Sequence, residues 1–167
     1  DARDMFASLH RAGYRTLLLT GDRSVVAERV SRELQIGSYH ADLTPRQKAE
    51  LVTGLPAAAV MMVGDGINDA PALSSAAIGC ALAGSTDIAV ESADLILTRP
   101  DLSSIPFALR LAKNTLVNIK QNLLWAFSYN LIAIPLAVSG SLAPAYAAAA
   151  MPISSICVLL NALRLKG

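Results

Sequence analysis

Four short apolar runs in the first part of the chain have the length of buried strands, and a weaker candidate surrounds Tyr39. The runs cover residues 15–20, 58–63, 77–82 and 94–97. Helix-type patterns lie between them, at 24–34 and 46–54. We expect Ser24 to be the N-cap of the first helix, and Pro45 stands at the first turn of the second, where proline is well tolerated. This alternation predicts an α/β domain with a parallel, Rossmann-like sheet covered on both faces.

From Leu102 onward the pattern changes to that of a long helix with Asp101 or Ser103 as its cap. Apolar residues recur there at spacings of three and four, namely Ile105, Leu109, Ala112, Leu116 and Ile119. No residue from 121 to 163 is charged. Because about 20 helical residues cross the apolar core of a bilayer, this stretch predicts a two-helix transmembrane hairpin. Its helices are expected at 121–140 and 141–165, with a break at Ser139-Gly140-Ser141.

Basic residues flank the uncharged stretch and set its expected orientation. They precede it at Arg110, Lys113 and Lys120 and follow it at Arg164 and Lys166, whereas the connection has none. By the positive-inside rule, both ends should face the cytoplasm. Two alternatives remain open: a buried helical hairpin in a large soluble protein, and a membrane-surface helix over 101–120.

The composition agrees with a partly membrane-embedded chain. Hydrophobic residues make up 53% and charged residues 16%, against about 25% charged in a typical soluble domain. The net charge of +1 gives no indication of a nucleic-acid partner. Cys80 and Cys157 are too few for a disulfide framework or a four-cysteine zinc site, so we expect both to be small core residues.

The candidate chemistry lies in Gly64-Asp65-Gly66-Ile67-Asn68-Asp69-Ala70-Pro71, directly after an apolar run. Glycine allows a close approach of the backbone to a phosphate, and carboxylates are the oxygen ligands that Mg²⁺ prefers. The segment therefore predicts a magnesium–phosphate site with Asp65 and Asp69 sharing one cation. A plain Asp-Gly hairpin turn is the alternative, but it does not explain Asn68, Asp69 and Pro71 together. Since ligands bind at the carboxyl ends of parallel strands, Thr20 and Asp65 should share one sheet edge.

Three motifs in order resemble those of the P-type cation ATPases, which are haloacid-dehalogenase-like phosphotransferases. Leu18-Leu19-Thr20-Gly21-Asp22 is similar to the second superfamily motif, Leu43-Thr44-Pro45-Arg46-Gln47-Lys48 to the third, and the Asp65 segment to the fourth. The resemblance implies a partial haloacid-dehalogenase-type phosphorylation domain over 1–100 and a cytoplasmic stalk helix over 101–120. It also implies the roles of the motif residues: Thr20 and Gly21 hydrogen-bond the phosphoryl group, Lys48 supplies a cation, Asp65 anchors Mg²⁺, and Asn68 and Asp69 support the metal and the surroundings of the nucleophile.

The uncharged part resembles the end of the heavy-metal-transporting subclass, and within it the copper(I) pumps. The resemblance rests on Tyr129-Asn130, on 151–155 and on 161–165, and it implies that Tyr129, Asn130, Met151 and Ser155 bind the transported Cu⁺. A thioether is a soft ligand suited to this ion, although Met151 and the nearby serines could instead serve helix packing. The acidic residue and the lysine that zinc and cadmium pumps tend to carry in these helices are absent. Pro152 is expected to kink its helix.

The phosphorylated Asp-Lys-Thr-Gly-Thr motif of the family does not occur in the sequence. We therefore expect the C-terminal fragment of a pump, inactive by itself, in which ATP is bound mainly by the missing N-terminal portion. The other expected partners are a lipid bilayer, the metal ion and a copper chaperone, and the expected location is the plasma membrane. The alternatives are a zinc/cadmium-type or other heavy-metal pump and a membrane-tethered haloacid-dehalogenase-like phosphatase remnant.

Overall fold

The computed structural model describes residues 2–56, 60–99, 101–140 and 144–164. The chain divides into two compact units, Asp1–Pro106 and Phe107–Gly167. The first unit is an α/β domain, and the second consists of helix.

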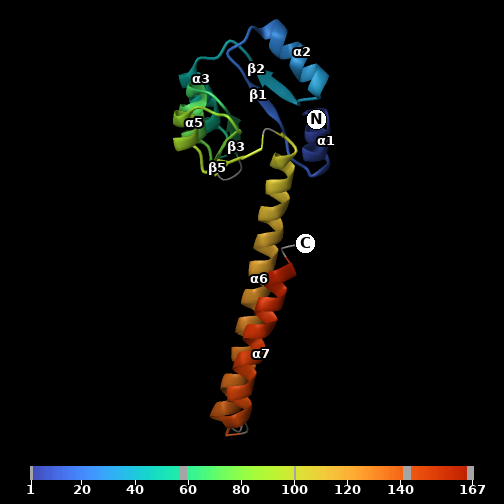
Figure 1. Ribbon diagram of the computed structural model, residues 1–167, viewed down its shortest axis with the longest axis vertical. Coiled ribbons are helices and arrows are strands. Elements are labelled where there is room, and N and C mark those ends of the chain that lie inside the picture. Colours follow the sequence, from blue (N-terminus) through green and yellow to red (C-terminus); the bar gives the residue numbers. More distant parts are fainter. Residues whose placement is uncertain (1, 57–59, 100, 141–143, 165–167) are drawn as a thin grey trace. The chain divides into compact units, whose positions relative to one another are not determined.

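The first unit alternates short strands with helices (Figure 1). Its elements are α1 (Ala2–Arg11), β1 (Leu17–Leu19), α2 (Ser24–Leu34), β2 (Ser38–His40), α3 (Pro45–Gly54), β3 (Met61–Gly64), the 3₁₀ helix η2 (Ile67–Asp69), α4 (Ala70–Ser75), β4 (Ile78–Ala81), α5 (Asp87–Glu91) and β5 (Leu95–Ile96). Each predicted strand is confirmed, including the weak candidate around Tyr39. Helices α4 and α5 were not predicted from the sequence, because at six and five residues they are too short to show a helical period.

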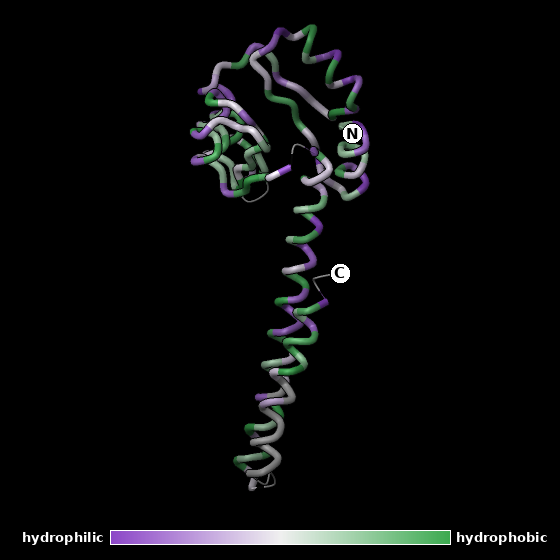
Figure 2. Tube along the Cα trace, in the orientation of Figure 1, coloured by the Kyte–Doolittle hydropathy of each residue, from purple (hydrophilic) through white to green (hydrophobic). Residues whose placement is uncertain are grey.

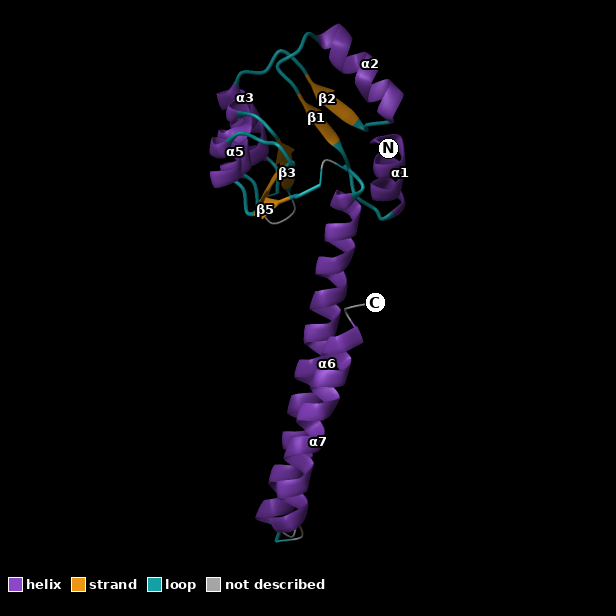
Figure 3. Ribbon diagram, viewed as in Figure 1, coloured by secondary structure: helices purple, strands orange, loops and turns teal. Residues whose placement is uncertain are grey.

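The strands form two separate parallel sheets rather than the single sheet that the sequence predicted. Strand β1 pairs with β2, with Leu18 opposite Tyr39, and the second sheet has the order β3-β4-β5. In the described residues, β1 and β3 each hydrogen-bond to one neighbouring strand only. Figure 3 shows the two groups of strands within the first unit, and the chain passes from β2 to β3 through α3. Each sheet therefore ends in an edge strand with unpaired backbone groups.

Helices α2 and α3 begin in different ways. Thr44 is the N-cap of α3: its hydroxyl accepts a hydrogen bond from the backbone N–H of Gln47, whose side chain accepts one from the backbone N–H of Thr44. This capping box, with Pro45 after it, confirms the predicted start. The prediction of Ser24 as the N-cap of α2 was wrong. Ser24 is already helical, and the N-cap is Arg23, which has an extended backbone and no capping side-chain bond.

The core of the first unit is centred on Leu73 of α4 and Cys80 of β4, both fully buried. A side chain at Gly79 would meet the backbone carbonyl of Leu73 at 2.8 Å, so glycine lets β4 pass this close to α4. The placement of Cys80 in the core is confirmed, and its burial raises the pKa of the thiol. The same prediction for Cys157 was wrong, because this residue is exposed.

The second unit contains most of α6 (Ser104–Val138) and all of α7 (Pro144–Leu163). Helix α6 runs unbroken over 35 residues with Pro135 inside it, so the predicted stalk and the first hairpin helix are one element. Just before it, the carboxylate of Asp101 accepts hydrogen bonds from the backbone N–H and the hydroxyl of Ser103. These bonds hold the pKa of Asp101 below its usual value.

Among the described residues, no helix combines the length and the apolarity that a membrane crossing requires. The transmembrane hairpin predicted over 121–165 is therefore not supported by the structure. That prediction rested on the absence of charge, but uncharged polar residues such as Gln121, Asn122 and Asn130 also lower the apolarity of α6. Figure 2 shows hydrophilic positions among the hydrophobic ones along this helix.

Candidate functional site

Lys48 and Asp69 join α3 to η2 through an ion pair. The Nζ atom of Lys48 lies 2.7 Å from Oδ1 of Asp69, and the two side chains are only 13% and 15% exposed. They are 21 positions apart in the sequence, so only the packing of α3 against η2 brings them together. Because the pair is largely shielded from water, each charge depends on the other for its stabilisation. The cation of Lys48 is thus held at a fixed place beside the end of β3.

The end of β3 is built around the side chain of Asp69. A Cβ atom at Gly64 would lie 2.7 Å from Cβ of Asp69, which is closer than real contacts allow. At Gly66 the nearest atoms would be 3.9 Å away, an ordinary distance. Glycine at position 64 is therefore required for packing, because it lets Asp69 lie against the strand and reach Lys48.

Asp65 follows β3 and is exposed. Its backbone carbonyl accepts a hydrogen bond of 3.1 Å from the N–H of Thr86, and the carbonyl of Gly64 accepts one from Leu82. Thr86 also caps α5 with its side chain. Sequence reasoning did not assign Thr86 a role, although a threonine before the helical residues 87–91 is a recognisable cap signal. The backbone of Asp65 is thus anchored, while its carboxylate remains open to a ligand.

Thr20 lies in the turn after β1, where it is held by Asp22. The Thr20 hydroxyl donates to Oδ2 of Asp22 and accepts from the backbone N–H of Asp22, both at 3.1 Å. A Cβ atom at Gly21 would lie 3.2 Å from the carbonyl of Leu43, so the turn packs closely against the loop before α3. In this arrangement the Thr20 hydroxyl hydrogen already has an acceptor, and Asp22 fixes its orientation.

The predicted residues are connected through neighbouring segments. The Leu43 N–H donates to the carbonyl of Thr20, Thr44 caps α3, and α3 carries Lys48 to Asp69. In the described part of the chain, no hydrogen bond joins Thr20 directly to Asp65, and Asn68 is exposed on η2. These segments present a hydroxyl after β1, a cation on α3 and an exposed carboxylate after β3, which are groups of the kinds that bind a phosphate accompanied by a cation.

The described residues contain no cluster of three or more acidic, histidine or cysteine side chains that could hold a metal ion. Asp65 and Asp69 do not form a simple pair of ligands, because one oxygen of Asp69 is taken by Lys48. The donor set nevertheless fits Mg²⁺ in part, since Asp65 offers the hard oxygen that this ion prefers. Further oxygen ligands would have to come from phosphate, water or another part of the protein.

Sequence comparison relates the chain to known proteins. A family model described as haloacid dehalogenase-like hydrolase matches residues 1–77, and a second with the same description matches 49–109. Copper-exporting P-type ATPases of Staphylococcus aureus (strain MRSA252) and Bacillus subtilis (strain 168) are 46% and 47% identical over 99% of this chain. The chain belongs to the P-type ATPases. It spans about a fifth of the length of these relatives, 21% in each case.

Solved structures of P-type ATPases also resemble the chain. A zinc-transporting PIB-type ATPase in the E2.Pi state has a TM-score of 0.92 and 36% identity, covering 98% of this chain and 27% of the other. The catalytic domain of the CPx-ATPase CopB-B has a TM-score of 0.59 and 30% identity, covering 65% of this chain and 44% of the other. The resemblance to the zinc-transporting structure therefore extends over both units.

The residues predicted to bind the transported metal are not seen as an assembled site. The side chains of Tyr129 and Met151 lie outside the described part of the structure. Asn130 is exposed and donates a hydrogen bond to the carbonyl of Ala126 in its own helix, and Ser155 is exposed on α7. Pro152 lies inside α7, which continues as helix on both sides of it. The copper site stays a prediction in this P-type ATPase chain.

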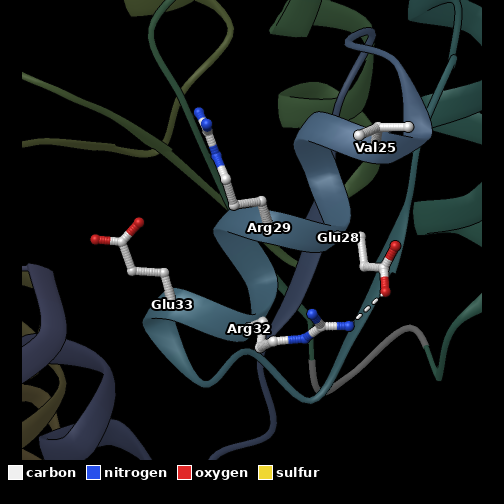
Figure 4. A pocket seen from close by; sticks show the side chains of 5 residues that line it. All are labelled: Val25, Glu28, Arg29, Arg32 and Glu33. Carbon is white, nitrogen blue, oxygen red and sulfur yellow. Dashed lines mark hydrogen bonds and ion pairs between the residues drawn. The ribbon is translucent and has the colours of Figure 1, made fainter.

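A surface hollow of about 430 Å³ lies over α2, apart from the residues discussed above. Its lining residues are Val25, Glu28, Arg29, Arg32 and Glu33, all from this one helix. Figure 4 shows Arg32 directed toward Glu28, its partner in an exposed ion pair of 2.6 Å. Such an exposed pair, one helical turn apart, is typical of a solvated helix face. None of the candidate phosphate-binding residues lines this hollow.

Proposed function

We propose that this chain is the C-terminal part of an ATP-driven heavy-metal pump, which forms an aspartyl-phosphate on a segment outside the chain. The copper-exporting relatives favour this reading over a membrane-tethered phosphatase remnant. The complete pump is a membrane protein in this proposal. The many exposed apolar side chains of α6 and α7, Leu131 and Ile132 among them, would be covered there by lipid or by the rest of the pump.

The observation that carries the proposal is the pair of open sheet edges at β1 and β3. Both strands belong to parallel sheets, and both end at candidate phosphate-binding residues, Thr20 and Asp65. One added parallel strand between β1 and β3 would unite the sheets in the order β2-β1-new strand-β3-β4-β5. An aspartate at the carboxyl end of that strand would lie between Thr20 and Asp65. The chain lacks an Asp-Lys-Thr-Gly-Thr motif, and this is the place where its strand would fit.

The side chains of the site then have separate tasks in phosphoryl transfer. The phosphoryl group passes from ATP to the external aspartate, ADP leaves, and water later cleaves the acyl phosphate. Lys48, held by Asp69, would stabilise the negative charge on the transferring group. The Gly21 N–H would bind its oxygens together with the Thr20 hydroxyl, whose hydrogen would have to turn from Asp22 to the phosphoryl group. Asp65 would hold Mg²⁺, with Asn68 and Asp69 supporting the site, and the ion when bound neutralises phosphate charge. ATP itself would be bound mainly by the part of the pump outside this chain.

The chain alone, incubated with ATP and Mg²⁺, should form no acid-stable, hydroxylamine-sensitive phosphoenzyme, because it lacks the phosphorylated aspartate. Co-expression with the preceding part of a copper-exporting relative, which carries that aspartate, should restore the phosphoenzyme by completing the sheet. Labelling with [γ-³²P]ATP measures both results. A phosphoenzyme formed on the chain by itself would contradict the proposal.

Copper(I) is the proposed cargo, bound by Met151 and Ser155 of α7 and by Tyr129 and Asn130 of α6. Met151 and Ser155 are four positions apart and share one face of the helix. The thioether suits a soft monovalent ion, and the copper-exporting relatives at 46% and 47% identity support the assignment. Zinc is the competing cargo, because the structure with a TM-score of 0.92 is that of a zinc-transporting ATPase. A copper chaperone would be the donor of the ion.

Met151→Leu in the complete pump should abolish most copper-stimulated ATPase activity. The change nearly conserves volume and apolarity, so it should cost less than about 1.5 kcal/mol in packing, yet it removes a soft donor. Ile156→Leu, an equally conservative change at an exposed position of the same helix, is the matched control and should leave stimulation intact. The assignment of copper as the cargo would be contradicted if Met151→Leu left copper stimulation unchanged. It would also be contradicted if zinc, but not copper, stimulated the unmodified pump.

A further inference from the structure

Four carboxamide side chains meet where α7 lies along α6. Asn118, Gln121 and Asn122 come from α6, and Asn161 comes from α7; we call these four residues the amide cluster. The Nδ2 of Asn118 donates to the backbone carbonyl of Asn161 at 2.6 Å. The side chain of Asn161 donates to Oδ1 of Asn122 at 2.8 Å and to Oε1 of Gln121 at 3.3 Å. Residues 43 positions apart in the sequence are therefore joined by hydrogen bonds.

Asn161 is the centre of the amide cluster. The nitrogen of its side-chain amide donates to two acceptors on α6, and its backbone carbonyl accepts a third hydrogen bond from α6. Asn122 in turn donates to Oδ1 of Asn118 at 3.0 Å, which orients Asn118 for its own bond. Gln121 and Asn122 lie three and four positions after Asn118, so the three residues lie on the same side of α6. Asn118 is buried, with 7% of its surface exposed.

The amide cluster differs in kind from the apolar surface around it. Apolar contacts are non-directional and roughly proportional to area, so they tolerate sliding of one helix along another. Hydrogen bonds need a fixed distance and direction. A shift of α7 by one turn would carry the side chain of Asn161 away from Gln121 and Asn122. Polar groups that lose their partners away from water are costly. Because carboxamides stay neutral, this constraint does not change with pH.

We propose that Asn161 is a positioning residue that fixes the register of α7 on α6, and that the amide cluster rather than apolar packing selects that register. A single buried polar residue is known to fix register in coiled coils by the same physical means, at some cost in stability. The inference concerns the second unit alone and does not depend on which metal is transported.

The test measures the register directly, in the full chain in detergent micelles. One spin label is attached to Cys157, which is exposed on α7, and a second to Lys113→Cys, an exposed position of α6; Cys80 is fully buried and should not react. In the chain without further changes, the pulsed-EPR distance distribution should be single and narrow. In Asn161→Leu it should broaden about twofold or split, because the side-chain bonds to Gln121 and Asn122 are lost and only the bond of Asn118 to the backbone carbonyl of residue 161 remains beside apolar packing.

The matched control is Asn114→Leu, which removes an exposed carboxamide from α6 one turn before Asn118. Its distance distribution should equal that of the parent chain. Far-UV circular dichroism checks that helix content is kept. If Asn161 only stabilised the helix pair, its replacement would lower the unfolding midpoint without changing the distance between the labels. If Asn161→Leu fails to fold, Asn122→Leu is the second test. It removes one acceptor of Asn161 and the donor to Asn118 but keeps the bond from Asn161 to Gln121, so it should broaden the distribution to a smaller degree. An unchanged distribution in the folded variant would overturn the proposal.

In the complete pump a second consequence follows, and it rests on the proposed function. Helix α6 begins at Ser104 and continues unbroken to Val138, so a fixed register would make α7 follow every displacement of α6. Asn161→Leu should then lower the amount of metal moved per ATP hydrolysed, while phosphoenzyme formation persists. If the EPR distances broaden but the amount of metal moved per ATP does not change, Asn161 fixes the helix register without coupling it to transport.

Discussion

Replacing Asp65 by asparagine in the complete pump should reduce phosphorylation at limiting Mg²⁺ by more than about tenfold, because a neutral amide is a poor ligand for a hard cation. The fold should survive, since Asp65 is exposed and is anchored through its backbone carbonyl, which the substitution retains. Raising the Mg²⁺ concentration should recover part of the activity. The measurement is the phosphoenzyme level as a function of Mg²⁺ concentration.

Asp4→Asn provides the control for this prediction. Asp4 is an exposed carboxylate on α1, outside the site, so its loss should leave the Mg²⁺ dependence unchanged. If Asp65→Asn shows the same Mg²⁺ dependence as the unmodified pump, Asp65 is not the anchor of the ion. Asp69 would then be the remaining carboxylate of the segment, with the oxygen that Lys48 does not occupy.

Lys48→Met should have two separable effects. It removes the cation beside the proposed phosphoryl position, and the loss of one such stabilising group typically lowers the rate about 10²- to 10³-fold. It also leaves the carboxylate of Asp69 largely shielded from water without its partner, which should lower the free energy of unfolding by about 1–3 kcal/mol. Phosphoenzyme formation measures the first effect, and urea unfolding of the full chain measures the second.

The chain offers a matched control in the same helix. Arg46 of α3 pairs with Glu50 at 2.9 Å, but their side chains are 89% and 59% exposed. Arg46→Met should therefore cost less than about 1 kcal/mol. In the double variant Lys48→Met/Asp69→Asn, most of the lost stability should return, because the unpaired charge is gone, whereas phosphorylation should stay low. Equal destabilisation by Arg46→Met and Lys48→Met would show that the shielding of the Lys48–Asp69 pair has no energetic consequence.

Local patterns in the sequence were sufficient to predict the strands of the first unit and the start of α3. The apolar runs are short and bounded by polar residues, and Thr44-Pro45 with Gln47 forms a complete helix start. These features depend on neighbours along the chain, so they can be recognised without the fold. The family resemblance likewise came from short motifs, and the comparisons confirmed it.

Other predictions differed from the structure for separate reasons. The prediction of a single sheet was wrong because, in the described residues, β1 pairs only with β2 and β3 pairs only with β4, a choice of partners that the strand sequences do not reveal. Ser24 was wrong as a cap because the backbone of Arg23, rather than a side chain, begins α2. The membrane hairpin was inferred from missing charges, and the described residues do not support it, because none of their helices is long and apolar enough to cross a membrane.

The sequence by itself determined the strands, the helices α2, α3, α6 and α7, the family and the residues that carry candidate chemistry, since propensity, periodicity and motif spacing are properties of neighbouring residues. Only the tertiary structure decided how those residues are used. It paired Lys48 with Asp69 across 21 positions, and it joined Asn118 to Asn161 across 43. The physical reason is that a hydrogen bond or ion pair between distant segments forms only when the packing of whole helices brings donor and acceptor within about 3 Å, a condition that depends on the fold as a whole.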